Sequence, residues 1–173
     1  MNAISLFFPK LDFTDIKVRC YADASYGKLS DGGSQGGMLV ELVSKDLTSP
    51  VAWQSRRITR IVNNTMAAET LAMVKALDSA FLISSLLSEL LYEGKKKIQL
   101  EAITDSEALY ESSYATKSVK DRRLRIDLSI IREYIINEKL VISWVPSGYQ
   151  VADCLTKEGV DDSKLLAHVT KEV

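Results

Sequence analysis

The sequence predicts an α/β domain in which a five-stranded mixed sheet, an antiparallel meander followed by parallel strands, is flanked by helices. Two observations support this prediction. Three stretches with strand patterns follow one another through short connections, which favours antiparallel neighbours. Two later strand-like stretches are each reached through helical ones, which favours parallel strands joined by right-handed crossovers. The expected order is β-β-β-α-β-α-α-β-α.

The three leading strands are predicted from alternation and from turn residues. Apolar and polar residues alternate from Ile16 to Asp23, as is typical of a half-buried strand, with Asp23 on its polar face. The glycine-rich residues 27–37 are predicted to form a turn. Residues 38–43 and 51–54 then read as two further strands, joined through 45–50.

The longest predicted element is a helix from about Met66 to Leu91. Its small alanines would let the helix lie close to a sheet. The residues predicted to share its inner face, at spacings of three or four, are Glu69, Ala72, Ala76, Ala80, Ile83, Leu87 and Leu90.

The second half of the chain alternates strands and helices. A strand over 98–104 ends at Asp105, and a short helix covers 106–113. Asp121 is a plausible cap for another helix, whose apolar stripe predicts its buried side. A buried strand over 140–145 follows, and residues 150–157 begin a last helical turn or two. The stripe consists of Leu124, Leu128, Ile131 and Ile135.

Length and composition favour one packed domain over 1–173, with its core at about 16–158. A hydrophobic content of 46% and only 3 prolines argue against a disordered chain. The net charge of −1 gives no support to a strongly basic nucleic-acid coat. Two cysteines are too few for a disulfide scaffold and suit a reducing compartment. Charges within the apolar stretch 66–92 argue against a membrane span.

Four carboxylates occupy positions that structure alone does not readily explain: Asp23, Glu69, Asp105 and Asp153. If the first, fourth and fifth strands are parallel, their carboxyl ends meet at one edge, where open α/β sheets bind ligands. Each acid alone has a structural alternative. Glu69 and Asp153 suit a first helical turn, Asp105 suits an N-cap, and Asp23 suits a turn.

Taken together, four converging carboxylates would repel one another unless a divalent cation neutralised them. Because every donor is an oxygen, the set favours Mg²⁺ or Mn²⁺ over zinc.

At these residues the chain resembles the ribonuclease H domain of copia-type LTR retrotransposon polyproteins. Seven stretches match in the family's order and cover about residues 16–158. The stretches are YADASYG (21–27), SQGGMLVEL (34–42), VAWQSRR (51–57), NTMAAETLAM (64–73), ITDSEALYE (103–111), DRRLRIDLSIIRE (121–133) and WVPSGYQVADCLTK (144–157).

The resemblance implies a ribonuclease H-like fold and a metal-dependent endonuclease that hydrolyses the RNA strand of an RNA–DNA hybrid during reverse transcription. The products would be a 5′-phosphate and a 3′-hydroxyl. A reverse transcriptase domain of the same polyprotein would be a further partner, and the setting would be intracellular, in the cytoplasm, a virus-like particle or the nucleus. The family's catalytic, metal-binding acids map onto Asp23, Glu69, Asp105 and Asp153, which would hold two magnesium or manganese ions.

The chain departs from many cellular ribonucleases H, which carry a histidine in the loop before the last acid. That loop is 146–150 here, and the single histidine, His168, lies beyond it. Copia-type members lack the histidine as well, so the departure bears on turnover rate more than on activity.

Candidate substrate contacts lie close to the acids in sequence. Basic and amide side chains precede Glu69, and Ser106 follows Asp105. A second basic cluster covers 117–125, and a solvated charged face is the alternative for both clusters. Trp53 and Trp144 are predicted to be core residues. The proposed substrate-binding residues are Arg56, Arg57, Asn63, Asn64 and Ser106, with Arg60 beside them.

Two other functions remain compatible with the sequence. One is a different nuclease of the same superfamily that acts on DNA, although such enzymes usually space their acids differently. The other is a domesticated, inactive domain that serves as a binding or structural module. Retention of all four acids argues against the second, because an unused acidic cluster costs stability.

Overall fold

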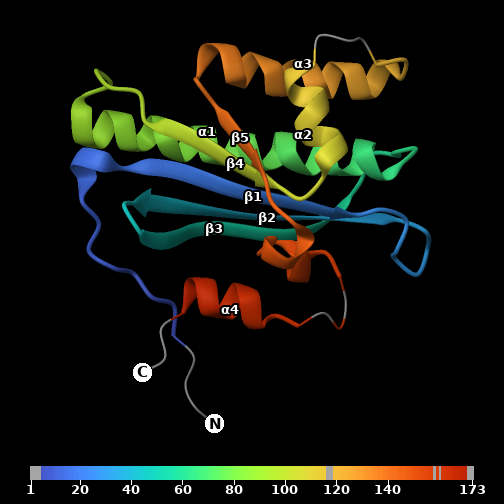
Figure 1. Ribbon diagram of the computed structural model, residues 1–173, viewed down its shortest axis with the longest axis horizontal. Coiled ribbons are helices and arrows are strands. Elements are labelled where there is room, and N and C mark those ends of the chain that lie inside the picture. Colours follow the sequence, from blue (N-terminus) through green and yellow to red (C-terminus); the bar gives the residue numbers. More distant parts are fainter. Residues whose placement is uncertain (1–4, 116–118, 158, 160, 171–173) are drawn as a thin grey trace.

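The computed structural model describes residues 5–115, 119–157, 159 and 161–170 (Figure 1). Its centre is one five-stranded sheet in the order β3-β2-β1-β4-β5. β2 is antiparallel to both β1 and β3, whereas β4 runs parallel to β1 and to β5. The strands are β1 (Lys17–Ser25), β2 (Ser34–Ser44), β3 (Leu47–Ile58), β4 (Gln99–Thr104) and β5 (Val141–Trp144). The predicted mixed sheet is confirmed.

Helices cover both faces of the sheet (Figure 1). Three lie on one face, and the fourth lies on the other. They are α1 (Thr65–Tyr92), α2 (Glu107–Tyr114), α3 (Arg122–Asn137) and α4 (Ser163–Val169). The 3-10 turn Asp153–Leu155 lies within 150–157, where a last helical turn or two was predicted, and a further 3-10 turn, Ser147–Tyr149, precedes this range. The helix α4 was not foreseen.

The main core lies between α1 and the sheet. Ala72, Ala76 and Ala80 are buried there, which confirms that small residues bring the helix close to the strands. Leu90 is 80% exposed, so its assignment to the inner face was wrong. A helix of 28 residues is about 42 Å long and β1, with 9 residues, only about 30 Å, so the last turns of α1 extend past the sheet.

By length and composition alone, α1 could cross a membrane, so its four charges exclude a span less firmly than the sequence suggested. In this structure, however, α1 is the core helix, and 44% of its most apolar window is buried inside the protein.

Two strands are longer than the sequence suggested. Residues 34–37, predicted to belong to a turn, form the beginning of β2, where Gly37 pairs with Asp23. A Cβ on Gly37 would lie 2.8 Å from side-chain atoms of Leu155 and Thr156, so glycine permits close approach of the Asp153–Leu155 turn. The connection from β2 to β3 is only 45–46, with Lys45 at a φ of 55°.

Both tryptophans are exposed, in contrast to their predicted place in the core. Trp53 is 56% exposed on the edge strand β3, where it faces away from α1. Trp144 is 45% exposed, and its indole Nε1 donates to the Asp105 carbonyl over 3.0 Å. An edge strand and a strand end offer too few neighbours to cover a ring of this size.

Candidate active site

Three of the four predicted acids converge at one edge of the sheet. Asp23 lies near the end of β1, Asp105 directly follows β4, and Glu69 comes from the second turn of α1. One carboxylate oxygen of each lies within 4.8 Å of the others. The parallel pairing of β1 with β4 brings the two aspartates together, and α1, packed over β1, adds the glutamate.

Glu69 is the most perturbed of the three. Its side chain is buried, and among the described residues its Oε2 has no hydrogen-bond partner. Burial, together with the charges of Asp23 and Asp105, raises the pKa of Glu69 to about 9. A macrodipole role does not explain a carboxylate that is buried against two like charges. At neutral pH this position therefore holds either a proton or a cation.

Asp23 is equally buried but has a partner. It accepts a hydrogen bond from the Thr156 hydroxyl. Burial raises the pKa of Asp23, and Asp105 and Asp153 add to this effect, while the Thr156 hydroxyl and the Lys157 ammonium oppose it. The segment after β5 therefore reaches into the site.

Asp153 lies beside the three converging acids but outside their group. Its carboxylate forms an ion pair with the Lys157 ammonium, one turn later in the chain. Burial would lower the pKa of Lys157, but the hydrogen bond to Asp153 and the charges of Asp23, Asp153 and Asp105 outweigh it, so the pKa is raised. Sequence reasoning missed Lys157, although its spacing of four from Asp153 was a usable signal.

The residues present fit a divalent cation. Three carboxylates share one small volume, all offered donors are oxygens, and a buried Glu69 oxygen lacks a partner among the described residues. Hard cations such as Mg²⁺ and Mn²⁺ prefer such donors. Asp23, Glu69 and Asp105 could hold the ion, with Asp153 at the border of the site.

Two predicted substrate contacts cap helices in this structure. The Asn64 side chain accepts from the Ala67 N–H at 2.8 Å and begins α1. Ser106 accepts from the Leu109 N–H at 3.3 Å and begins α2. Because Ser106 is the cap, the structural alternative for Asp105 is wrong, and its carboxylate remains available. Asp121 caps α3, as predicted.

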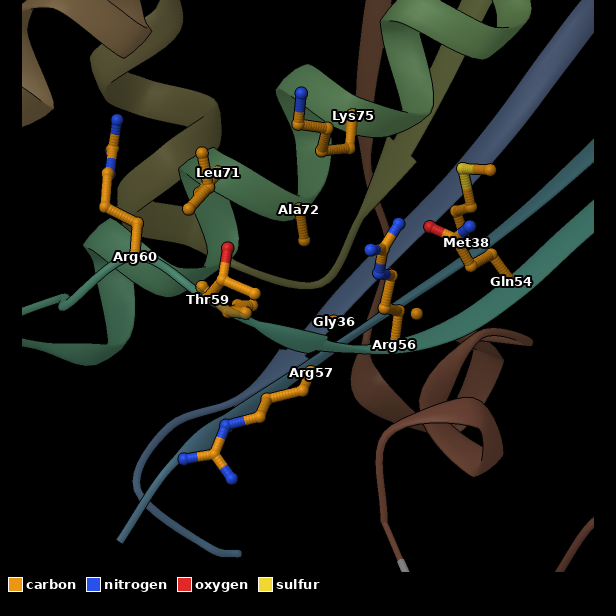
Figure 2. A pocket seen from close by; sticks show the side chains of 12 residues that line it. Gly36, Met38, Gln54, Arg56, Arg57, Thr59, Arg60, Leu71, Ala72 and Lys75 are labelled. Atoms are coloured by element: carbon orange, nitrogen blue, oxygen red, sulfur yellow. The ribbon is translucent and has the colours of Figure 1, made fainter.

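The predicted basic contacts separate into paired and unpaired groups; the side chains of Arg56, Arg57 and Arg60 are shown in Figure 2. Arg57 pairs with Asp31, and Arg60 pairs with Asp127 on α3. Asn63 donates to Asp121 over 3.3 Å. Arg56 is exposed and has no hydrogen-bond or ion-pair partner within the described part of the chain. In the second cluster, Lys117 lies outside the described residues, and the exposed residues are Lys120, Arg122, Arg123 and Arg125.

Solved structures with the same fold are ribonucleases H. RNase H1 from the archaeon Halobacterium salinarum has 24% identity and a TM-score of 0.59, over 84% of this chain and 98% of that one. The N-terminal RNase H domain of a Mycobacterium tuberculosis protein has 19% identity and a TM-score of 0.62, over 88% and 96%. LC11-RNase H1, isolated from compost and solved in complex with an RNA/DNA hybrid, has 18% identity and a TM-score of 0.60, over 85% and 99%.

No protein-family model and no curated protein sequence matches the chain. The similarity is therefore one of structure, and it agrees with the strand order and helix placement described above. The chain has the ribonuclease H-like fold.

Proposed function

We propose that this chain is a metal-dependent ribonuclease H that hydrolyses the RNA strand of RNA–DNA hybrids. The observation that carries the proposal is the convergence of Asp23, Glu69 and Asp105 within 4.8 Å, with a Glu69 oxygen buried and unpartnered among the described residues. Such an arrangement is unfavourable in a structural core but suits the binding of a cation. The likeness in fold to ribonucleases H, one of them in complex with a hybrid, supports the choice of substrate.

The chain's own residues have distinct roles in this proposal. Asp23, Glu69 and Asp105 would hold the cation, and Asp153 would complete the site from the far side. When bound, Mg²⁺ or Mn²⁺ supplies Lewis-acid stabilisation of phosphate charge and lowers the pKa of bound water. Thr156 fixes the Asp23 carboxylate through its hydroxyl, and Lys157 offsets part of the negative charge. Selectivity for the hybrid would follow groove shape and 2′-hydroxyl contacts.

The seven ordered motifs favour a retrotransposon setting of the copia type. In that setting a reverse transcriptase domain of the same polyprotein would supply the hybrid. Attachment to a polymerase raises the local concentration of substrate, which suits a chain with a net charge of −1.

The test is an assay with labelled RNA–DNA hybrid, duplex RNA and duplex DNA, each with Mg²⁺, with Mn²⁺ and with EDTA. We expect cleavage of the RNA strand in the hybrid only, ending in 5′-phosphate, and no cleavage in EDTA. Equal cleavage of duplex DNA would instead support the alternative of a DNA-acting nuclease. Hybrid binding without cleavage under any metal would support an inactive module.

A further inference from the structure

A groove of about 420 Å³ lies between α1 and the strands β2 and β3 (Figure 2). Its floor is apolar and includes Gly36 and Met38 from β2 and Ala72 from α1. Gly36 keeps the floor open, because a Cβ there would occupy space between Ile58 and Ala72. The groove is therefore a consequence of small residues on two facing elements.

The groove approaches the acids along α1. Gly36 pairs with Ala24, the residue after Asp23, but neighbouring residues of a strand face opposite ways, so the Asp23 side chain lies on the other face of β1 from the groove floor. Ala72 follows Glu69 by three residues, a rise of about 4.5 Å on the same side of α1. A polymer that places one unit at the carboxylates would therefore extend into this groove with its next units.

The charged residues that line the groove are cations: Arg56, Arg57, Arg60 and Lys75. Arg56 points toward α1 (Figure 2) and has no ion-pair partner within the described part of the chain. Lys75 on α1 is exposed and forms a long ion pair with Asp78, at 3.7 Å. No aspartate or glutamate is among the described residues that line the groove. The groove therefore suits a polyanion with apolar parts.

Arg57, the next residue, provides a contrast. Neighbouring residues of a strand point to opposite faces, and Arg57 points away from α1 (Figure 2) and pairs with Asp31. Both arginines border the groove, but only the Arg56 side chain turns toward α1, and the Arg57 guanidinium is held by Asp31.

We propose that this groove binds the sugar–phosphate backbone of the nucleic-acid strand next to the carboxylate site, with Arg56 and Lys75 on phosphates and the Met38–Ala72 floor against sugars or bases. The inference rests on the proposed function, which identifies the strand as part of the cleaved hybrid. Exposed cations over an apolar floor match the alternation of phosphate and nucleoside better than they match an acidic peptide, which lacks large apolar units between its charges.

The experiment measures hybrid binding by fluorescence anisotropy in the Asp105→Asn background, which prevents cleavage. Salt is varied between about 50 and 200 mM, because log K falls by about 0.9 for each phosphate contact per tenfold rise in salt. Arg56→Ala should weaken binding about three- to tenfold and reduce the slope by about one contact. Lys75→Ala should act in the same direction, and the double variant should lose about two contacts.

Lys45→Ala is the charge-matched control, because Lys45 lies in the turn between β2 and β3 and pairs with Asp12. Far-ultraviolet circular dichroism and thermal melts would confirm that each variant is folded. An unchanged slope for folded Arg56→Ala and Lys75→Ala variants would overturn the groove proposal. So would a larger loss for Arg57→Ala, which would place the strand on the opposite face, or equal displacement of the hybrid by polyglutamate.

Failure of the groove and failure of the proposed function give different results. If the unsubstituted chain cleaves hybrid but the Arg56 variant keeps the full salt slope, only the groove is wrong. If the chain binds hybrid through Arg56 without cleaving it under any metal, only the nuclease proposal is wrong. A chain that binds no hybrid at low salt overturns both.

Discussion

Two buried glutamates on opposite sides of the sheet differ in the charged side chains that surround them. Glu41 on β2 is fully buried, with the His168 Nε2 at 2.6 Å from its Oε2 and an Arg19 Nη1 at 3.5 Å from its Oε1. Glu69 on α1 is almost as buried, but its charged neighbours are Asp23 and Asp105. Glu41 thus has the Arg19 guanidinium and the His168 ring beside it, whereas two like charges outweigh the nearby Lys157 ammonium at Glu69.

This difference separates a carboxylate with a structural role from the one for which we propose a bound cation. Around Glu41, the side chains of Arg19, Glu101 and Lys17 continue a chain of ion pairs, and His168 joins it from α4. The pairing ties the last helix to the sheet and uses the only histidine of the chain. His168 therefore lies on the face of the sheet that α4 covers and is not part of the carboxylate site. A buried acid without such compensation marks the functional edge.

The largest expected effect that distinguishes the two glutamates is on catalysis. Glu69→Gln and Asp105→Asn should each lower the cleavage rate of hybrid by about 10³-fold or more, because each removes a charged ligand of the cation. Glu41→Gln should stay within about threefold of the unsubstituted chain when assayed well below its melting temperature, since Glu41 lies outside the site. Single-turnover rates at saturating protein provide the measurement. Comparable losses for Glu41→Gln and Glu69→Gln would contradict the distinction.

The second prediction concerns stability against pH in EDTA. The folded-state pKa of Glu69 is raised to about 9 from an ordinary value of 4.5, so the folded protein keeps a proton that the unfolded chain releases. Its stabilising contribution is complete below pH 4.5 and is lost as pH rises toward 9, at up to about 1.4 kcal/mol per pH unit. Glu69→Gln should remove much of this slope.

Urea unfolding at several pH values within that window provides the measurement. Millimolar Mg²⁺ should also flatten the slope, because a bound cation replaces the proton and stabilises only the folded state. An unsubstituted chain whose free energy of unfolding in EDTA is independent of pH would show that Glu69 is not held in this environment.

The third prediction is a loss of stability when Glu41, on the face of the sheet covered by α4, is replaced. Glu41→Gln should lower the free energy of unfolding by about 2 kcal/mol, because it removes the buried carboxylate that contacts His168 and one of the two acids paired with Arg19. Glu69→Gln in EDTA at pH 8 should have the opposite sign. Urea unfolding of both variants tests the pair, and His168→Gln should reproduce part of the Glu41 loss. If Glu41→Gln were neutral, the ion pairs would not be what holds α4.

The sequence predicted some features of this site and left others undecided. Alternation and strand order were enough to place Asp23 and Asp105 at one edge, because parallel strands end together. Sequence alone did not decide whether Asp105 or Ser106 caps α2, since both residue types are good caps. Nor did it decide which of Arg56 and Arg57 faces α1, because both faces of the edge strand β3 carry polar residues.

Long-range pairing was outside the reach of local patterns. Glu41 and His168 are 127 residues apart, and nothing near either residue indicates the other. Trp53 and Trp144 were assigned to the core on residue type alone, but their burial depends on where the sheet ends. Strands and helices that follow a local periodicity were therefore predictable. Contacts between residues far apart in the sequence, and the burial that depends on them, were not.

The smallest expected effect concerns Lys157, a cation close to the carboxylate site, and it tests how much Lys157 offsets the negative charge around Glu69. Lys157 pairs with Asp153 and opposes the negative charge around Asp23. Because it offsets part of the field that attracts a divalent cation, Lys157→Met should tighten Mg²⁺ binding by about threefold, or about 0.7 kcal/mol. Isothermal titration calorimetry measures the affinity directly, and the Mg²⁺-dependent rise in melting temperature provides a second readout. Lys45→Met, remote from the site, should leave the affinity unchanged. Weaker Mg²⁺ binding in Lys157→Met would show that Lys157 organises the acids for the cation instead of competing with it, and would make its ion pair with Asp153 part of the metal site.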